Sequence, residues 1–149
     1  MSERKIKVVL DTSTIISGFF WKGNESQLLK LIENDKIKLY ITKEILFEIE
    51  EVLKKPKFKN IIFKSSLTIN EIINFIITIS NLIENKHTIN VCRDKSDNKF
   101  IECAASCSAD FIISGDNDLL CLKKYRKIKI VKTIEFLRTV KNKESPKIS

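Results

Sequence analysis

Residues 6–11 read Ile-Lys-Val-Val-Leu-Asp, a short and nearly continuous apolar run that ends at an aspartate. Such a run is typical of a strand that is buried on both faces of a parallel sheet. Runs at residues 38–41 and 110–114 have a similar character, and the segments between them carry apolar residues at helical spacing. The sequence therefore predicts strands that alternate with helices, as in βαβ units.

The other elements follow from the same periodicities and from capping residues. Thr42 can cap a helix, and Thr68 with Glu71 has the form of a capping box. The isoleucines after Thr68 repeat at helical spacing, which favours one long helix over a strand. The expected helices span residues 24–35, 42–54, 58–63, 68–83, 96–107, 117–124 and 133–140, a further strand spans 129–131, and residues 88–92 are expected to be extended.

These patterns predict an α/β protein with three layers, α/β/α, around a mainly parallel central sheet. The 149 residues correspond to one domain, which we expect over residues 1–140, followed by a polar tail over residues 141–149 that we expect to be flexible. No apolar run approaches the roughly 18 residues of a membrane span. The run Val8–Leu10 is also too short for a signal peptide. We therefore expect a cytoplasmic protein without a membrane partner.

The chain is basic, because 27 Lys and Arg against 19 Asp and Glu give a net charge of +8. This excess favours a polyanionic partner, nucleic acid first, although a lysine-rich composition that only maintains solubility explains it equally well. The single histidine, His87, disfavours histidine-type zinc sites, paired-histidine phosphodiester chemistry and Ser-His-Asp triads. An enzyme of this sequence would therefore work with carboxylates, hydroxyls, thiols or amines.

Acidic residues stand near the ends of the predicted strands. Asp11 directly follows the first strand, and Asp116 and Asp118 follow the third. Glu48 lies in the helix after the second strand, and Asp97 opens the helix before the third. Right-handed crossovers bring the carboxyl ends of parallel strands to one edge of the sheet, where open α/β sheets bind ligands. A single aspartate after a strand more often makes a turn or caps a helix, but several acids converging on one edge of a basic protein indicate a site.

Repulsion makes such a cluster costly. Two carboxylates about 4 Å apart repel by roughly 4 kcal/mol at an effective dielectric constant near 20, and a domain is stable by only about 5–15 kcal/mol. The cluster is tolerated if some carboxylates are protonated or if a cation bridges them. Oxygen ligands without soft ligands nearby favour Mg²⁺ or Mn²⁺, and such an ion activates water and stabilises charge on an attacked phosphate.

Four motifs in order resemble those of the PIN-domain family: Val8–Ser13, Thr42–Ile49, Cys92–Phe100 and Ser114–Leu120. Each motif is weak alone, but together they extend the resemblance over about residues 5–137. They are similar to the subgroup regarded as toxin components of toxin–antitoxin systems, related to VapC toxins. The resemblance implies an α/β/α PIN fold and a ribonuclease that depends on Mg²⁺ or Mn²⁺.

The resemblance also implies roles for individual residues. Helical periodicity does not choose between Glu48 and Glu50, which border the apolar stripe of their helix on opposite sides, whereas the resemblance favours Glu48. Ser13 stands where the family usually has Asn, and Ser114 where it often has Thr, so both keep a small hydrogen-bonding group beside the acids. Whether Asp116 or Asp118 is the main fourth acid, and whether one or two ions bind, stays open. The implied catalytic and metal-binding residues are Asp11, Glu48, Asp97, Asp116 and Asp118, supported by Ser13 and Ser114, with Arg93 and Lys99 as phosphate contacts.

The partners implied by the resemblance are an RNA substrate, a cognate antitoxin protein and a second copy of the chain in a homodimer. Two other functions fit some of the residues. One is a non-catalytic PIN-like module that binds RNA or a partner protein, which the presence of an acid at every motif argues against. The other is a phosphotransfer domain, which is disfavoured because Asp11-Thr12-Ser13 lacks the second aspartate of a DxD pair.

Overall fold

The computed structural model describes residues 4–144, with side chains described as far as residue 141. Six strands form one sheet in the order β3-β2-β1-β4-β6-β5. All neighbouring strands run parallel except β5 and β6, which form an antiparallel hairpin. The mainly parallel sheet is therefore confirmed. Its strands are β1 (Lys7–Leu10), β2 (Lys38–Ile41), β3 (Ser80–Leu82), β4 (Phe111–Ile113), β5 (Lys124–Tyr125) and β6 (Ile128–Val131).

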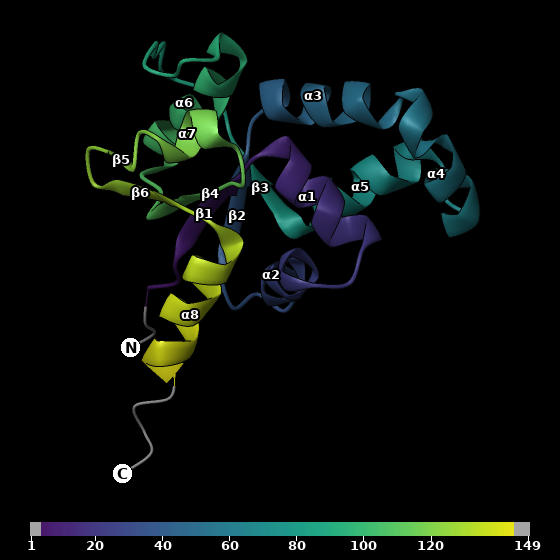
Figure 1. The fold of residues 1–149 in the computed structure, drawn as a ribbon, viewed down its shortest axis with the longest axis horizontal. Coiled ribbons are helices and arrows are strands. Elements are labelled where there is room, and N and C mark those ends of the chain that lie inside the picture. The colour runs from purple at the N-terminus through teal and green to yellow at the C-terminus, as the bar shows by residue number, and fades with distance from the viewer. Residues whose placement is uncertain (1–3, 145–149) are drawn as a thin grey trace.

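Helices cover both faces of this sheet and give the expected three layers. On one face α6 packs across β1, β2 and β4, whereas α1, α2 and α8 lie on the other face, where α2 contacts both α1 and α8 (Figure 1). Helices α3, α4 and α5 extend to one side of the sheet, away from the β5–β6 hairpin. The helices are α1 (Thr12–Phe20), α2 (Asn24–Glu33), α3 (Lys43–Leu53), α4 (Lys59–Ser65), α5 (Ile69–Ile79), α6 (Asn98–Cys107), α7 (Asn117–Leu120) and α8 (Thr133–Glu144), with 3₁₀ turns η1 (Pro56–Phe58) and η2 (Lys95–Asp97).

The central strands explain the apolar runs in the sequence. Val8, Val9 and Leu10 of β1 are at most 1% exposed, because β1 is covered by helices on both faces and by β2 and β4 on its two sides. Ile112 and Ile113 of β4 are completely buried for the same reason. Burial of this apolar surface contributes about 25 cal/mol per Å² to folding, so β1 and β4 form the centre of the core.

The strand order places a crevice at the carboxyl ends of β1 and β4. The chain moves from β1 to β2 and β3 in one direction across the sheet, whereas β6 follows β4 in the other direction. Ligands of open α/β sheets bind where the direction changes in this way. Leu10 is paired in register with Ile113, and the amide of Asp11 donates to the carbonyl of Ile113 at 3.2 Å. Asp11 and Ser114 therefore leave the sheet side by side.

The long helix expected over residues 68–83 is shorter in the structure. The Thr68–Glu71 capping box is present as predicted, but α5 ends at Ile79 and Ser80–Leu82 form the edge strand β3. β3 pairs with β2, and the Asn81 side chain donates to the carbonyl of Leu39. Pairing with β2 therefore outweighs the helical periodicity of the isoleucines.

Three other elements differ from the sequence predictions. Helix α1 was not expected, because its apolar residues are compressed into nine positions directly after Asp11. Residues 88–92, which are expected to be extended, belong to no described helix or strand, and the amides of residues 91 and 92 donate to the Asn98 side chain. The helix expected over 117–124 ends at Leu120, and the next residues turn into β5. Helix α8 continues to Glu144, four residues beyond the expected end, and residues 145–149 of the expected tail lie outside the described residues.

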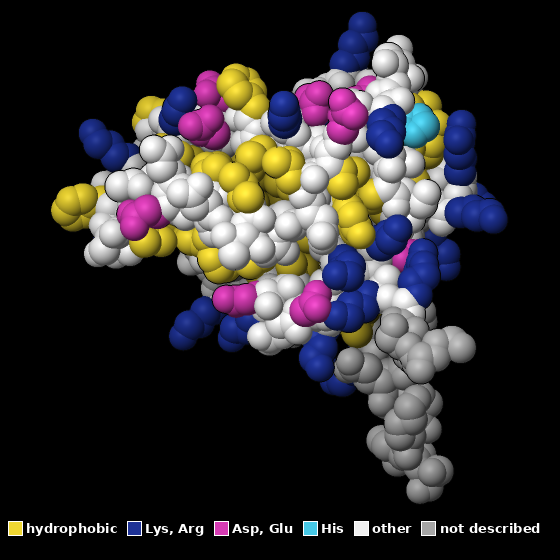
Figure 2. Space-filling model, turned by 180° about the vertical axis from the view of Figure 1, so that it is seen from behind, with side chains coloured by type: hydrophobic (Ala, Val, Ile, Leu, Met, Phe, Trp, Pro, Cys, Tyr) yellow, Lys and Arg dark blue, Asp and Glu magenta, His cyan; other side chains and the backbone are white. Residues whose placement is uncertain are grey.

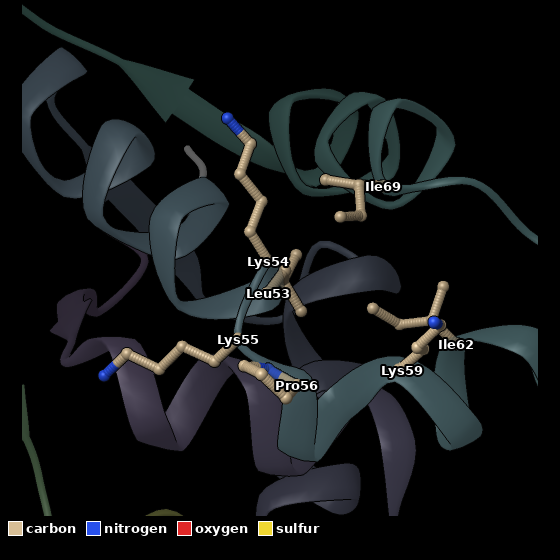
Figure 3. Close-up of a pocket in the computed structure, with 7 residues that line it drawn as sticks. All are labelled: Leu53, Lys54, Lys55, Pro56, Lys59, Ile62 and Ile69. Carbon is tan, nitrogen blue, oxygen red and sulfur yellow. The ribbon is translucent and has the colours of Figure 1, made fainter.

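Several large hydrophobic side chains are exposed in one half of the molecule. Figure 2 shows hydrophobic side chains gathered over the half of the molecule that holds α3–α5, where Phe63 is 83% exposed and Phe47 64%. A pocket of about 490 Å³ opens in that half, with apolar residues at its base and three lysine side chains around it (Figure 3). It is lined by Leu53, Lys54, Lys55, Pro56, Lys59, Ile62 and Ile69.

Within residues 4–144, no single helix has the length and apolar character to cross a membrane. The required length and apolar composition are met only by two segments taken together, Pro56–Ser65 and Ile69–Ile79, which are bent by 78° relative to each other.

Candidate active site

Asp11 is fixed at the carboxyl end of β1 and is only 4% exposed. Its Oδ1 accepts a hydrogen bond from the Thr14 amide at 2.9 Å, which caps α1, and its Oδ2 accepts one from the Ser114 hydroxyl at 2.5 Å. Burial raises the pKa of the Asp11 carboxyl above its usual value, although the hydrogen bonds from Ser114 and Thr14 oppose this shift. The first predicted acid is therefore both buried and immobilised.

Ser114 connects Asp11 to Asp116. The buried Ser114 hydroxyl donates to Asp11 and accepts from the Asp116 amide at 2.9 Å. Asp116 in turn caps α7, because its Oδ1 accepts from the Asp118 amide at 2.9 Å. Asp116 therefore both caps a helix and lines the acid pocket, and Ser114 hydrogen-bonds to two of the predicted acids; a supporting role for Ser114 in catalysis stays a prediction.

The carboxyl group of Asp97 is buried without hydrogen bonds from the described part of the chain that would offset the cost of its burial. It precedes α6 but makes no capping hydrogen bond, it is 7% exposed, and its Oδ2 is buried with no hydrogen-bond partner among the described residues. Burial raises the pKa of Asp97 to about 7, and the contact with Asp116 and the charges of Asp116, Asp94 and Asp11 act in the same direction. Buried polar atoms almost always have a partner, so the lone Oδ2 makes Asp97 a candidate ligand for a cation in the pocket.

Asp11, Asp97 and Asp116 line one pocket of about 370 Å³. Three segments that are distant in the sequence therefore bring their carboxylates to one place, as the strand-end argument predicted. Ser13 also lines this pocket and is exposed, but the hydroxyl that donates to Asp11 is that of Ser114. The remaining lining residues are Thr12, Phe100 and Gly115.

A second group of carboxylates shares Asp97 with the first. One oxygen from each of Asp94, Asp97 and Asp118 lies within 4.8 Å of the other two. The Asp94 carboxylate accepts from the amide and the hydroxyl of Ser96 at 2.9 and 2.8 Å, and these bonds lower the pKa of Asp94. Sequence reasoning missed Asp94 as a member of the cluster. The signal that could have found it is its spacing of three residues from Asp97, which one turn of η2 converts into proximity.

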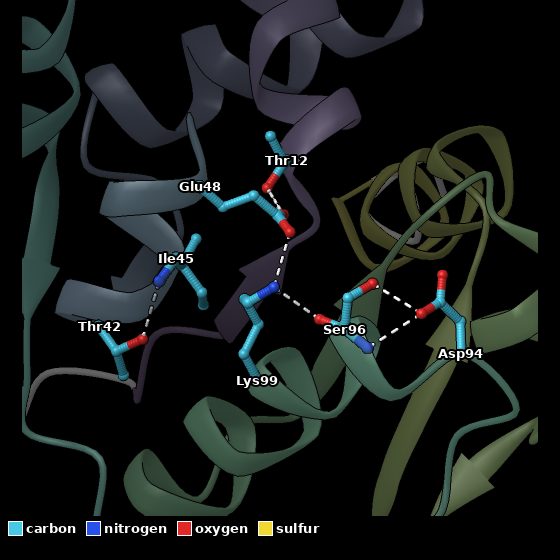
Figure 4. Close-up of polar contacts among 7 residues, drawn as sticks. All are labelled: Thr12, Thr42, Ile45, Glu48, Asp94, Ser96 and Lys99. Carbon is cyan, nitrogen blue, oxygen red and sulfur yellow. Dashed lines mark hydrogen bonds and ion pairs between the residues drawn. The ribbon is translucent and has the colours of Figure 1, made fainter. Parts of the chain in front are cut away.

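Glu48 reaches the site through hydrogen bonds. Its Oε1 accepts from the Thr12 hydroxyl, and its Oε2 accepts from the Lys99 ammonium at 2.6 Å. Lys99 also donates to the carbonyl of Ser96 at 2.7 Å, so one chain of contacts runs from Thr12 to Asp94 (Figure 4). Glu48 does not line the acid pocket itself, but Thr12 does. Helical periodicity left Glu48 and Glu50 equal, whereas these contacts connect Glu48 to the site.

Both basic residues suggested as phosphate contacts are paired with acids of the site. Lys99 is paired with Glu48, and Arg93 lies 3.0 Å from Asp118 and donates to the carbonyl of Asn117. Each cation balances part of the negative charge of the cluster. A phosphate contact for Arg93 or Lys99 stays a prediction, and it would require the side chain to exchange a carboxylate for a phosphate.

The donor set fits a hard divalent cation. All the converging groups offer carboxylate oxygen, which Mg²⁺ and Mn²⁺ prefer, and the buried Oδ2 of Asp97 lacks any other partner among the described residues. A family model described as PIN domain matches residues 7–118, from β1 to the last of the five predicted acids. The chain belongs to the PIN-domain family. PIN domains are generally nucleases that use divalent metal ions, in agreement with the acid cluster.

A relative of this PIN domain is found in an archaeon. The chain is 38% identical over 132 residues to the uncharacterized protein MJ1680 of Methanocaldococcus jannaschii, and the matched region covers 86% of this chain and 84% of that protein. The alignment therefore covers most of the length of both proteins.

Proposed function

We propose that this PIN domain is an endoribonuclease that depends on Mg²⁺ or Mn²⁺. The observation that carries the proposal is the buried, unpartnered Oδ2 of Asp97, surrounded by the carboxyl groups of Asp11, Asp116 and Asp94. A bound divalent ion supplies two things to phosphodiester hydrolysis: it lowers the pKa of water, and it neutralises charge that develops on the phosphate.

The acids divide into two sets that meet at Asp97. Asp11, Asp97 and Asp116 would hold a cation from the pocket, and Asp94 and Asp118 would extend the ligand set on the other side. Asp97 belongs to both sets, so the cluster has carboxylates enough for one ion or for two. Because a pKa of about 7 leaves Asp97 partly protonated at neutral pH, binding of a cation would release a proton.

The surrounding residues orient the acids. Ser114 and the Thr14 amide hold both oxygens of Asp11, which removes the freedom of this carboxylate to rotate. Thr12 and Lys99 hold both oxygens of Glu48, which keeps this acid beside the pocket. Sites that bind transition states depend on groups fixed in this way before the substrate arrives.

The test is cleavage of a mixed RNA pool during a Mn²⁺ titration, with wild type compared with Asp11→Asn. Asp35→Asn is the matched control, because Asp35 is an exposed carboxylate paired with Lys5 and Lys38 and outside the acid cluster. We expect cleavage that depends on Mn²⁺, is abolished in Asp11→Asn and is retained in Asp35→Asn. Binding of RNA without cleavage would favour a non-catalytic module, and transfer of phosphate to the protein would favour a phosphotransfer domain.

The role as a toxin is a finer proposal that rests on the sequence resemblance. It includes a cognate antitoxin as inhibitor and a homodimer as the assembled form. Purification of the protein from its native host, followed by identification of the proteins that co-elute, tests both partners. Growth arrest on expression of wild type, relieved by Asp11→Asn, tests toxicity.

A further inference from the structure

The β5–β6 hairpin carries a dense group of basic side chains. Six of the ten residues from 123 to 132 are basic, and none is acidic. All six side chains are exposed, and none takes part in an ion pair among the described residues. We refer to them as the hairpin cations: Lys123, Lys124, Arg126, Lys127, Lys129 and Lys132.

The hairpin ends beside the acid cluster. The Ser114 amide donates to the carbonyl of Val131 at 3.0 Å, so the carboxyl end of β6 lies next to the residue that holds Asp11. Lys132 follows directly. Because β6 is the parallel neighbour of β4, Lys132 leaves the sheet at the same edge as the acids.

A hollow of about 760 Å³ lies between α7 and the hairpin. Four of the hairpin cations line it, at positions 123, 124, 129 and 132, together with apolar residues that include Leu122 and Ile130 and with one acid, Glu135. Asn117 also lines this hollow, and the preceding residues, Gly115 and Asp116, line the acid pocket. Three consecutive residues thus connect the basic hollow to the candidate active site.

We propose that the hairpin cations bind the RNA strand on one side of the bond that is cleaved. The inference rests on the proposed function, and it adds where the substrate lies. The acids of the site repel a polyanion, so a strand that reaches them must be held by cations close by. The hairpin offers such cations next to the site, with Lys132 at the same sheet edge as the acids, and the apolar residues of the hollow offer a surface for a ribose or an unstacked base.

The pocket between α3, α4 and α5 provides an internal control. It also has lysines around apolar residues, but it lies in the half of the molecule opposite to the hairpin, and none of its lining residues belongs to the acid cluster. Equal numbers of lysines can therefore be neutralised at either place. The hairpin variant replaces Lys123, Lys124, Lys129 and Lys132 by Gln, and the control variant replaces Lys55, Lys57, Lys59 and Lys64 by Gln.

The experiment measures the fluorescence anisotropy of a labelled single-stranded RNA of mixed sequence, without divalent ions, over about 50–200 mM salt. We expect the hairpin variant to raise Kd about tenfold or more, a difference typical of the removal of several cations that neutralise phosphates. The slope of log Kd against log salt should fall by about 0.7 for each phosphate that the variant no longer neutralises. The control variant should keep Kd within about twofold, and circular dichroism should show both variants folded.

The inference would be overturned if both variants lost RNA affinity equally, or if the hairpin variant kept the Kd of wild type. The second result would favour an acidic protein as the partner of this surface. Because no divalent ion is present, the binding result does not depend on cleavage. A protein that binds RNA through the hairpin but never cuts it would contradict the proposed nuclease and still support the hairpin. With Mn²⁺ present, the hairpin variant should show a raised KM and an unchanged kcat.

Discussion

The buried carboxyl of Asp97 makes a quantitative prediction about stability. Its pKa is about 7 in the folded protein, against about 4 in an unfolded chain. The folded state therefore binds more protons than the unfolded state between these two values, and stability falls as pH rises through that window. The difference between the two pKa values corresponds to at most about 4 kcal/mol, a cost that is fully present above pH ~7.

Asp97→Asn removes this cost because the amide carries no charge. We expect the variant to be more stable than wild type at pH ~8, by up to about 4 kcal/mol, and to equal wild type near pH ~4. For a domain of this size the gain corresponds to roughly 2–4 °C in Tm for each kcal/mol. The variant should also show much less of the rise in Tm that Mn²⁺ gives to wild type, because a ligand that binds only the folded state stabilises it.

The measurement is urea unfolding at a series of pH values in the presence of a chelator, followed by thermal unfolding with and without Mn²⁺. Asp35→Asn serves as control, because ion pairs with Lys5 and Lys38 lower the pKa of that exposed carboxyl and its removal should have the opposite sign. A stability difference that does not change with pH, or a variant less stable than wild type at pH ~8, would refute the reasoning. An unchanged Tm of wild type in Mn²⁺ would argue against a metal site.

Three further predictions concern single sites in the fold. Gly18→Ala should lower the free energy of unfolding, measured by urea titration, by about 1–3 kcal/mol, because the new Cβ would lie 2.7 Å from the Glu25 carbonyl oxygen. Gly115→Ala is the control and should have little effect, because the space around Gly115 is open. Thr68→Ala should cost about 1 kcal/mol by removing one half of the capping box, and equal stability of variant and wild type would contradict the role of the cap. Lys99→Met should cost about 1–2 kcal/mol, and a double-mutant cycle with Glu48→Gln that gives no coupling energy would show that the partly buried pair contributes nothing.

The fold was predictable where local and tertiary preferences agree. The runs that became β1, β2 and β4 are apolar because the strands are buried on both faces, so sequence and environment give the same answer. Residues 80–82 were mispredicted because helical periodicity continues past Ile79, while hydrogen bonds to β2 decide the structure. Pairing partners so distant in the chain leave no local pattern in a single sequence.

The convergence of Asp11, Asp97 and Asp116 was predictable from the sequence, whereas the part played by Asp94 and the side-chain contacts were not. Asp11 and Asp116 follow the neighbouring parallel strands β1 and β4, and Asp97 precedes the helix α6 that packs on both strands, so the topology brings all three to one pocket. The pairing of Glu48 with Lys99 depends on side-chain directions of α3 and α6, which residue types do not encode. The role expected of Ser13 was hard to predict for the same reason. The hydroxyl of the neighbouring Thr12 donates to Glu48, whereas Ser13, one position further along α1, is exposed.

The position of β4 has a consequence for synthesis of the protein on the ribosome. β4 lies between β1 and β6 in the sheet, although it is translated after three of the six strands. Asp116 and Asp118, which follow β4, are the last acids of the cluster to be translated. Chains emerge at about 5–20 residues per second, so the nascent polypeptide spends several seconds with β1 exposed along one side and the pocket unassembled. During that interval the chain lies beside messenger and ribosomal RNA, and the proposed nuclease still lacks Asp116 and Asp118.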